Sequence, residues 1–177
     1  DLELVLTNRT VGRAQALVQR HAAWAAEHGV ALSASGLHEV TGSFDVVVNA
    51  SASSLQSGGV PVPASSLRAG TLALDMMYGA AAQPFVDWAA AHGARGRDGL
   101  GMLVEQAAES FFVWRGVRPD TAPVLAALHQ RLADLAVAGE RADGQQGLER
   151  EVGLLHRGHD AGDVLGLARG EVFDRPA

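Results

Sequence analysis

Cysteine and lysine are both absent from this sequence of 177 residues. Without cysteine, the chain can form no disulfide framework, carry no thiolate nucleophile and bind no zinc or iron–sulfur cluster through cysteine ligands. All 14 basic residues are arginine, so a mechanism that needs a lysine must find it elsewhere. The two absences remove whole classes of catalytic site before any motif is considered.

Long apolar runs are lacking too, and no stretch approaches the roughly 18 apolar residues of a membrane-spanning helix. Residues 1–10 hold two acids and no basic flank before an apolar core, so we expect no signal peptide and a cytoplasmic location. The net charge of −6 argues against a general nucleic-acid binder. His156 and His159 have no third ligand nearby in the sequence, and we expect no metal site.

What is present is an alternation of short apolar segments with longer segments that have helical spacing. Strands are expected at 2–7, 30–33, 45–49, 71–75 and 94–97. Helices are expected at 11–28, at 84–92, from 98–101 to about 115, and at 121–137. Strands that alternate with helices indicate βαβ units and a parallel sheet covered on both faces. The predicted fold class is α/β, a Rossmann-like doubly wound parallel sheet with helices at its C-terminal side.

The chain divides into three regions by composition. A sheet domain is expected over 1–100, and helices that close its cleft over 101–137. The tail, 138–177, holds 8 of the 21 glycines and lacks a sustained apolar face, so we expect it to be poorly structured. Asp1 stands directly before an apolar run, which suggests a fragment of a longer chain.

The first expected strand ends in Asn8, Arg9 and Thr10, and Arg13 follows one helical turn after Arg9. In dinucleotide-binding folds the end of the second strand meets the adenosine ribose, and an arginine there accommodates the 2′-phosphate of NADP. Arg9 and Arg13 can address one phosphate from the start of a helix. An equally weighted alternative is that these residues cap the helix and expose their side chains to solvent.

The Gly-rich turn that holds a pyrophosphate follows the first strand of such a fold, and this chain begins at the second. In the strand order 3-2-1-4-5-6 the first strand is central. We therefore expect an empty slot in the sheet, with unpaired backbone on both sides, unless the missing segment is supplied.

Five segments together resemble the shikimate dehydrogenase family. They are Thr-Asn-Arg-Thr-Val-Gly-Arg-Ala at 7–14, Phe-Asp-Val-Val-Val-Asn-Ala-Ser at 44–51, Asp-Met-Met-Tyr at 75–78, Gln-Pro-Phe at 83–85, and Asp-Gly-Leu-Gly-Met-Leu-Val-Glu-Gln-Ala-Ala at 98–108. The last is the most specific, and the resemblance covers about residues 2–136.

The resemblance implies a role for eleven residues. Those expected to hold the 2′-phosphate of NADP are Asn8, Arg9, Thr10 and Arg13. Those expected to line the cofactor are Ala50, Ser51 and Ser53, and those at its nicotinamide end are Met76, Tyr78 and Gly99. Those expected to reach the substrate are Gln106 and Tyr78.

Structural alternatives stay open for several of these positions. Gln106 could be an ordinary helix residue, and Met76 and Tyr78 could pack at a strand end. Asp75 is expected to fix its loop through backbone hydrogen bonds, and Asp98 to cap the following helix.

The resemblance further implies NADP-dependent, reversible reduction of 3-dehydroshikimate to shikimate in aromatic amino acid (chorismate) biosynthesis. The family's catalytic lysine and aspartate belong to a region that this chain does not contain, so the chain alone is expected to be inactive. Alternatives are a quinate/shikimate dehydrogenase and a non-catalytic NADP-binding module. The implied partner is a small-molecule substrate, with no nucleic acid or membrane, and either a monomer or a homodimer is compatible with the sequence.

Overall fold

The computed structural model describes residues 2–51, 60, 62–141 and 164–169, and these fall into two compact units. The sheet unit contains residues up to Gly99 together with 164–169, and the helical unit contains residues from Leu100 to Arg141. Among the described helices, none is long and apolar enough to cross a membrane.

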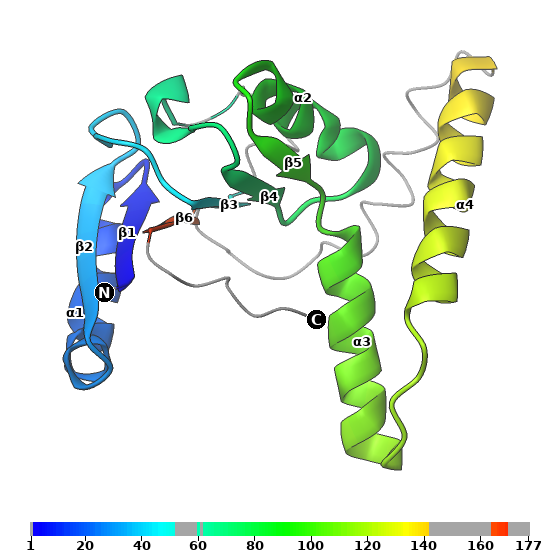
Figure 1. Cartoon of the computed structure of the whole chain (residues 1–177), viewed down its shortest axis with the longest axis horizontal. Coiled ribbons are helices and arrows are strands. Elements are labelled where there is room, and N and C mark those ends of the chain that lie inside the picture. The colour runs from blue at the N-terminus through cyan, green and yellow to red at the C-terminus, as the bar shows by residue number, and fades with distance from the viewer. Residues whose placement is uncertain (1, 52–59, 61, 142–163, 170–177) are drawn as a thin grey trace. The chain divides into compact units, whose positions relative to one another are not determined.

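A single sheet with the strand order β2-β1-β6-β3-β4-β5 forms the centre of the sheet unit (Figure 1). Its strands are β1 (Leu2–Asn8), β2 (Val30–Gly36), β3 (Val46–Ala50), β4 (Leu72–Asp75), β5 (Arg95–Arg97) and β6 (Val164–Arg169). The pairs β1–β2, β3–β4 and β4–β5 are parallel. The predicted α/β fold with a parallel sheet is confirmed, and β6 is its exception.

β6 corrects two expectations from the sequence. The slot between β1 and β3 is not empty, because β6 pairs antiparallel with both of them. The tail is not wholly irregular either, since residues 164–169 form this strand and the preceding helix continues to Arg141. The physical reason is that two neighbouring sheet edges present unpaired N–H and C=O groups, which any extended segment can satisfy whatever its side chains.

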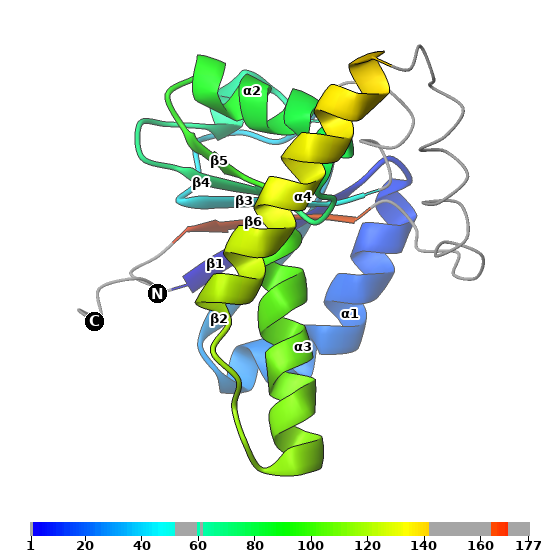
Figure 2. The same ribbon diagram turned by 90° about the vertical axis from the view of Figure 1, so that its right-hand side faces the viewer.

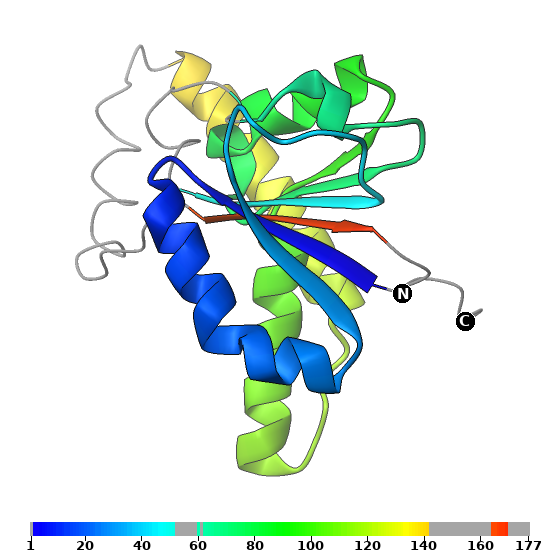
Figure 3. The ribbon, with the colours of Figure 1, turned by 90° about the vertical axis from the view of Figure 1, so that its left-hand side faces the viewer.

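Helices α1 (Val11–Glu27) and α2 (Gln83–Ala91) lie on opposite faces of the sheet (Figures 2 and 3). α1 buries Ala14 and Ala25, and the chain leaves it through Gly29, whose φ of +65° favours glycine. Proline stands in the first turn of α2, where its missing N–H costs no helical hydrogen bond. The doubly wound arrangement is therefore confirmed, and two short 3₁₀ turns (Ala64–Ser66 and Gly79–Ala81) complete the described unit.

The core of the sheet unit is apolar and lies against the strands. Its fully buried members include Phe44, Val47, Ala73, Phe85 and Ala89. Of the valine run of β3, only Val47 belongs to this core, and Val46 and Val48, which point to the other face of the sheet, are half-buried. This core, which includes Phe85 and Ala89 of α2, packs against the strands and holds their ends in place.

The helical unit consists of α3 (Leu100–Arg115) and α4 (Ala122–Arg141). α3 matches the predicted helix, and the turn after it begins at Gly116, whose φ is +71°. α4 begins one residue after the predicted start and ends four residues after the predicted end, Val137.

Candidate functional site

Five strands end at one edge of the sheet, because β1, β2, β3, β4 and β5 run in the same direction. In doubly wound sheets this carboxyl edge is where ligands bind. The residues that end or follow these strands include nine of the predicted positions, namely Asn8, Arg9, Thr10, Arg13, Ala50, Ser51, Met76, Tyr78 and Gly99. Ser53 lies outside the described residues. The edge is therefore the candidate site.

The turn between β1 and α1 is shaped by Asn8. Its side chain is buried, and Oδ1 accepts a hydrogen bond of 2.7 Å from the backbone N–H of Thr10. Thr10 precedes α1 and makes no side-chain capping bond, although its carbonyl accepts a bond of 2.9 Å from the Arg13 N–H. Arg9, Thr10 and Arg13 are exposed, and the first turn of α1 contains no acidic residue. Asn8 thus organises the turn, and the exposed groups around it form a positively charged helix start.

A buried polar pair joins the ends of β3 and β4. The Asn49 amide donates a hydrogen bond of 3.1 Å to Asp75 Oδ2, and both side chains are almost fully buried. Asn49 Oδ1 accepts hydrogen bonds from the Ser51 N–H at 3.1 Å and from the Ser51 hydroxyl at 2.7 Å. Asn49 therefore links the end of β4 to the loop that follows β3.

Asp75 also fixes the loop that follows its own strand. Its Oδ1 accepts a bond of 2.9 Å from the Met77 N–H, which confirms the expected loop-fixing role. Further along, the Gly79 N–H donates to Asp98 Oδ2 at 3.3 Å. The cap that we expected Asp98 to provide for α3 stays a prediction.

The neighbouring backbone leaves no room for a side chain at Gly99. A Cβ atom at this position would lie 2.3 Å from the carbonyl oxygen of Met76, far inside van der Waals contact. The Gly99 N–H donates a bond of 2.8 Å to the Met77 carbonyl. Glycine here brings the chain after β5 against the loop after β4.

Met76 and Tyr78 are exposed at this edge, with 37% and 40% of their surface accessible. Neither residue is therefore a packed strand-end side chain of the sheet unit. Ala50 is half-buried, and the Ser51 hydroxyl is buried and donated to Asn49. The carboxyl edge thus exposes the side chains of Met76 and Tyr78, while Asn49, Ser51 and Asp75 form buried hydrogen bonds.

Asn49 has no predicted role of its own, although it lies inside the motif at 44–51. The available signal was its position, because Asn49 and Asp75 are polar residues that end consecutive apolar strands. In a parallel sheet, such residues meet at the same edge.

Gln106 belongs to the helical unit, where its side chain is exposed on α3. The neighbouring Glu105 is tied to the turn before α4. Arg118 donates hydrogen bonds to Glu105 at 2.9 Å and to Glu109, and the Thr121 hydroxyl donates to Glu105 at 2.6 Å. The hydrogen bond from Thr121, followed by that from Arg118, lowers the pKa of Glu105 below its ordinary value.

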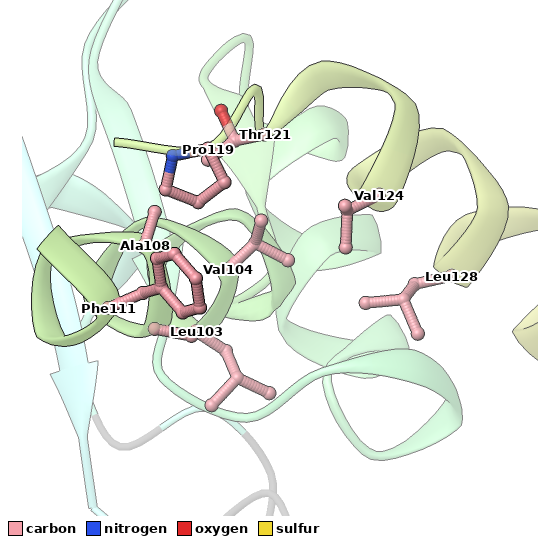
Figure 4. A pocket seen from close by; sticks show the side chains of 9 residues that line it. Leu103, Val104, Ala108, Phe111, Pro119, Thr121, Val124 and Leu128 are labelled. Atoms are coloured by element: carbon pink, nitrogen blue, oxygen red, sulfur yellow. The ribbon is translucent and has the colours of Figure 1, made fainter. Parts of the chain in front are cut away.

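An apolar cavity of about 310 Å³ lies between α3 and α4 (Figure 4). Its lining includes Leu103, Val104, Phe111, Pro119, Val124 and Leu128. The cavity offers almost no polar groups, so it has none of the donors or acceptors that would orient a polyol or a nucleotide. In the part of the chain that the structure describes, no group of three or more acidic or histidine side chains could hold a metal ion.

The chain is similar in sequence to shikimate dehydrogenases. The family model described as "Shikimate 5'-dehydrogenase C-terminal domain" matches residues 99–129. A shikimate dehydrogenase (NADP(+)) of Acidovorax ebreus is 62% identical over 130 residues, which are 73% of this chain and 46% of that protein. One of Methylibium petroleiphilum is 66% identical over 125 residues, 71% of this chain and 42% of that protein. The chain thus spans less than half the length of these relatives.

Solved structures give the same result at lower identity. Shikimate 5-dehydrogenase from Thermus thermophilus, in complex with NADP(H) and shikimate, matches with a TM-score of 0.52 and 26% identity over 70% of this chain and 44% of that one. The ligand-free 5-ketofructose reductase of a Gluconobacter strain matches with a TM-score of 0.55 and 26% identity, over 75% of this chain and 47% of that one. The Rossmann-like fold class is confirmed, as is the resemblance over the matched part.

Proposed function

Because 73% of this chain is homologous to NADP-dependent shikimate dehydrogenases, we propose that it supplies the NADP-binding part of such an enzyme. The proposed reaction is the reversible reduction of 3-dehydroshikimate to shikimate, in the route to chorismate and the aromatic amino acids. NADPH, when bound, supplies the hydride. The residues of this chain bind and orient the cofactor and one side of the substrate.

The observation that carries the proposal is the charged helix start at the carboxyl edge of the sheet. Arg9 and Arg13 are exposed in and beside the first turn of α1, which also offers backbone N–H donors and the Thr10 hydroxyl. A phosphate is stabilised at a helix N-terminus by those donors and by the helix dipole. The donor set therefore fits the 2′-phosphate of NADP, and Asn8 contributes by holding the turn.

The Asn49–Asp75 pair supports the remainder of the cofactor site. It holds the backbone of Ser51 and Met77 through hydrogen bonds to buried side chains. Ala50, Ser51 and Ser53 are proposed to line the cofactor, and Met76, Tyr78 and Gly99 to border its nicotinamide end.

On the substrate side, Gln106 is proposed to hydrogen-bond the hydroxyls of the substrate, since its amide offers both a donor and an acceptor. Tyr78 is proposed to contact the substrate as well. The chain contains no lysine. The catalytic lysine and aspartate of the complete enzyme are therefore proposed to come from outside this sequence, and the chain alone to be inactive. In this proposal, 1–100 and 101–137 act as the cofactor domain and its closing helices.

The 2′-phosphate site can be tested on the chain itself by calorimetric titration with adenosine 2′,5′-bisphosphate and with 5′-AMP. We expect the bisphosphate to bind more tightly. The double substitution Arg9→Ala, Arg13→Ala should weaken its binding at least about tenfold, because each charge-assisted hydrogen bond contributes roughly 1.5–3 kcal/mol. Arg20→Ala, an exposed arginine further along α1, is the matched control and should change little. Equal affinity for the two nucleotides would contradict the proposal.

Two alternatives make different predictions. A quinate/shikimate dehydrogenase would also oxidise quinate once the other half of the enzyme is supplied, and a non-catalytic module would bind NADP without turning over either substrate. One structural neighbour is a 5-ketofructose reductase, so the substrate assignment depends on the sequence relatives. A cytoplasmic location is part of the proposal, because the reaction draws on the NADPH pool there.

A further inference from the structure

The two outermost strands of the sheet differ in length and in charge. The strand order ends with β2 on one side and with β5 on the other. β5 has only three residues, and its exposed side chains are those of Arg95 and Arg97. Short edge strands with charged side chains resist pairing with a further strand. The β5 edge is therefore protected by its own sequence.

β2 has neither form of protection. It is seven residues long, Val-Ala-Leu-Ser-Ala-Ser-Gly, and it carries no charged side chain. Among the described strands, only β1 pairs with it, so in this part of the chain the outer edge of β2 has no partner strand (Figure 1). An uncharged edge of this length is a template for another strand.

The backbone of Gly36 indicates which residues of β2 face outward. Its N–H donates to Glu39 Oε2 at 3.3 Å, and its carbonyl accepts a bond of 3.1 Å from the Ser35 hydroxyl. Since these bonds lie outside the ladder with β1, Gly36 directs its backbone groups away from β1. Backbone groups alternate in direction along a strand, with a period of two residues. The other residues that direct theirs outward are Val30, Leu32 and Ala34.

These three residues match themselves in an antiparallel arrangement. With a second copy of β2 centred on Leu32, Val30 faces Ala34, and Leu32 faces the same residue of the other copy. Facing residues of this kind exchange hydrogen bonds in both directions. Ala31 and Ser33, which are exposed, face each other between them. Every facing pair is uncharged, so no like charges oppose each other across the contact.

The symmetry of this arrangement also limits its size. Antiparallel pairing of the same edge requires a two-fold axis perpendicular to the sheet, which leaves the helices of both copies on the faces that they already cover. Because α1 packs against β2 and β1, the α1 helices of the two copies would lie on one face of the joined sheet. Such an interface is isologous and closes after two copies. It therefore yields a dimer and not a fibre.

We propose that β2 is the dimerisation edge of this protein, and that its occupant is β2 of a second copy, antiparallel and centred on Leu32. β5 is excluded from the same role, because Arg95 would face Arg97 of the other copy in an antiparallel pair. The proposal does not rest on the proposed function, since it concerns an outer strand and not the residues proposed to bind NADP.

Disulfide cross-linking tests the register, and the absence of cysteine from the chain removes any background. Ala31→Cys and Ser33→Cys are made as separate full-length proteins. Facing Cα atoms at these positions would be about 4.5 Å apart, within reach of a disulfide. Each position would lie about 7–8 Å from its own counterpart, at the limit of that reach. Under mild oxidation, a mixture of the two proteins should therefore form cross-linked dimers at least tenfold faster than either protein alone.

Charge substitutions at the same two exposed positions test the dimer by sedimentation equilibrium. The double variant Ala31→Lys, Ser33→Lys sets like charges against each other and should raise the dissociation constant of the dimer at least tenfold over that of the original chain. The variant Ala31→Glu, Ser33→Lys is the matched control, because it sets opposite charges against each other at the same positions. It should dimerise at least as tightly as the original chain.

Circular dichroism establishes that each variant is folded before it is compared. If the lysine variant does not fold, the cysteine variants decide the matter, because they change the exposed side chains least. Cross-linking that is no faster in the mixture than in the separate proteins would overturn the proposal. A monomeric mass of the original chain at the highest soluble concentration would overturn it as well, as would equal dissociation constants for the two charge variants.

Discussion

The sheet unit and the helical unit differ in how they treat their large apolar side chains. In the sheet unit Phe85 is only 2% exposed and belongs to a continuous core. In the helical unit Trp114 is 77% exposed, and Phe111, Phe112 and Val113 of the same helix are exposed as well. The first unit therefore has a continuous buried core, although Trp24, Met76 and Tyr78 are exposed, whereas α3 of the second unit leaves four consecutive large apolar side chains exposed.

Their polar interactions differ in the same way. Asn49 and Asp75 are buried and hydrogen-bonded to each other and to backbone groups. The ion pairs of Arg118 with Glu105 and Glu109 are about half exposed, and exposed pairs contribute little to stability. The proposed cofactor site thus rests on buried hydrogen bonds, whereas α3 and α4 have exposed contacts and are expected to be the less stable part.

The largest expected effect is a loss of folding stability when a buried aromatic side chain of the sheet unit is removed. An exposed aromatic side chain of the helical unit serves as the comparison. Phe85→Ala leaves a cavity in the sheet core and should lower the free energy of unfolding by about 3–5 kcal/mol. Trp114→Ala removes an exposed ring and should change it by no more than about 0.5 kcal/mol. Urea titrations followed by circular dichroism measure both values. Similar losses for the two variants would mean that the contrast between the units is wrong.

A smaller effect is expected from two glycines that stand on either side of the boundary between the units. Gly99→Ala places a methyl group against the Met76 carbonyl and should cost about 1–3 kcal/mol through backbone displacement. Gly101→Ala meets nothing within 4 Å and should stabilise α3 slightly, because alanine is the better helix former. The same urea titrations compare them, and a destabilising Gly101→Ala would contradict this account of the helical unit.

The smallest effect concerns pH. The pKa of Glu105 is lowered by its hydrogen bonds with Thr121 and Arg118, so these contacts favour the charged, folded form. Their stabilising contribution is present above the ordinary glutamate pKa and is lost as the pH falls through the lowered value. An NMR titration of the Glu105 carboxyl should show its pKa rising in Arg118→Ala and unchanged in Arg131→Ala, an exposed arginine of α4. An equal pKa of Glu105 in the two variants would contradict the hydrogen bond between Arg118 and Glu105.

Most elements of the fold were predictable because their signals are local. The valine run of β3, the glycine after α1 and the proline at the start of α2 each act through the conformation of a few neighbouring residues. Motifs also located most of the proposed site, because the residues that follow parallel strands gather at one edge whatever the details of packing. The roles of these residues in binding stay predictions.

The alternation of strands and helices, the family resemblance and the position of the charged helix start are all predictable from the amino-acid sequence. The hydrogen bond between Asn49 and Asp75, the close approach of Gly99 to Met76 and the pairing of residues 164–169 in the sheet appear only in the folded structure. These contacts join segments far apart in the chain. The pairing of β6 in particular is made by backbone groups that every residue but proline carries, so no local pattern in the sequence specifies which segment takes that place.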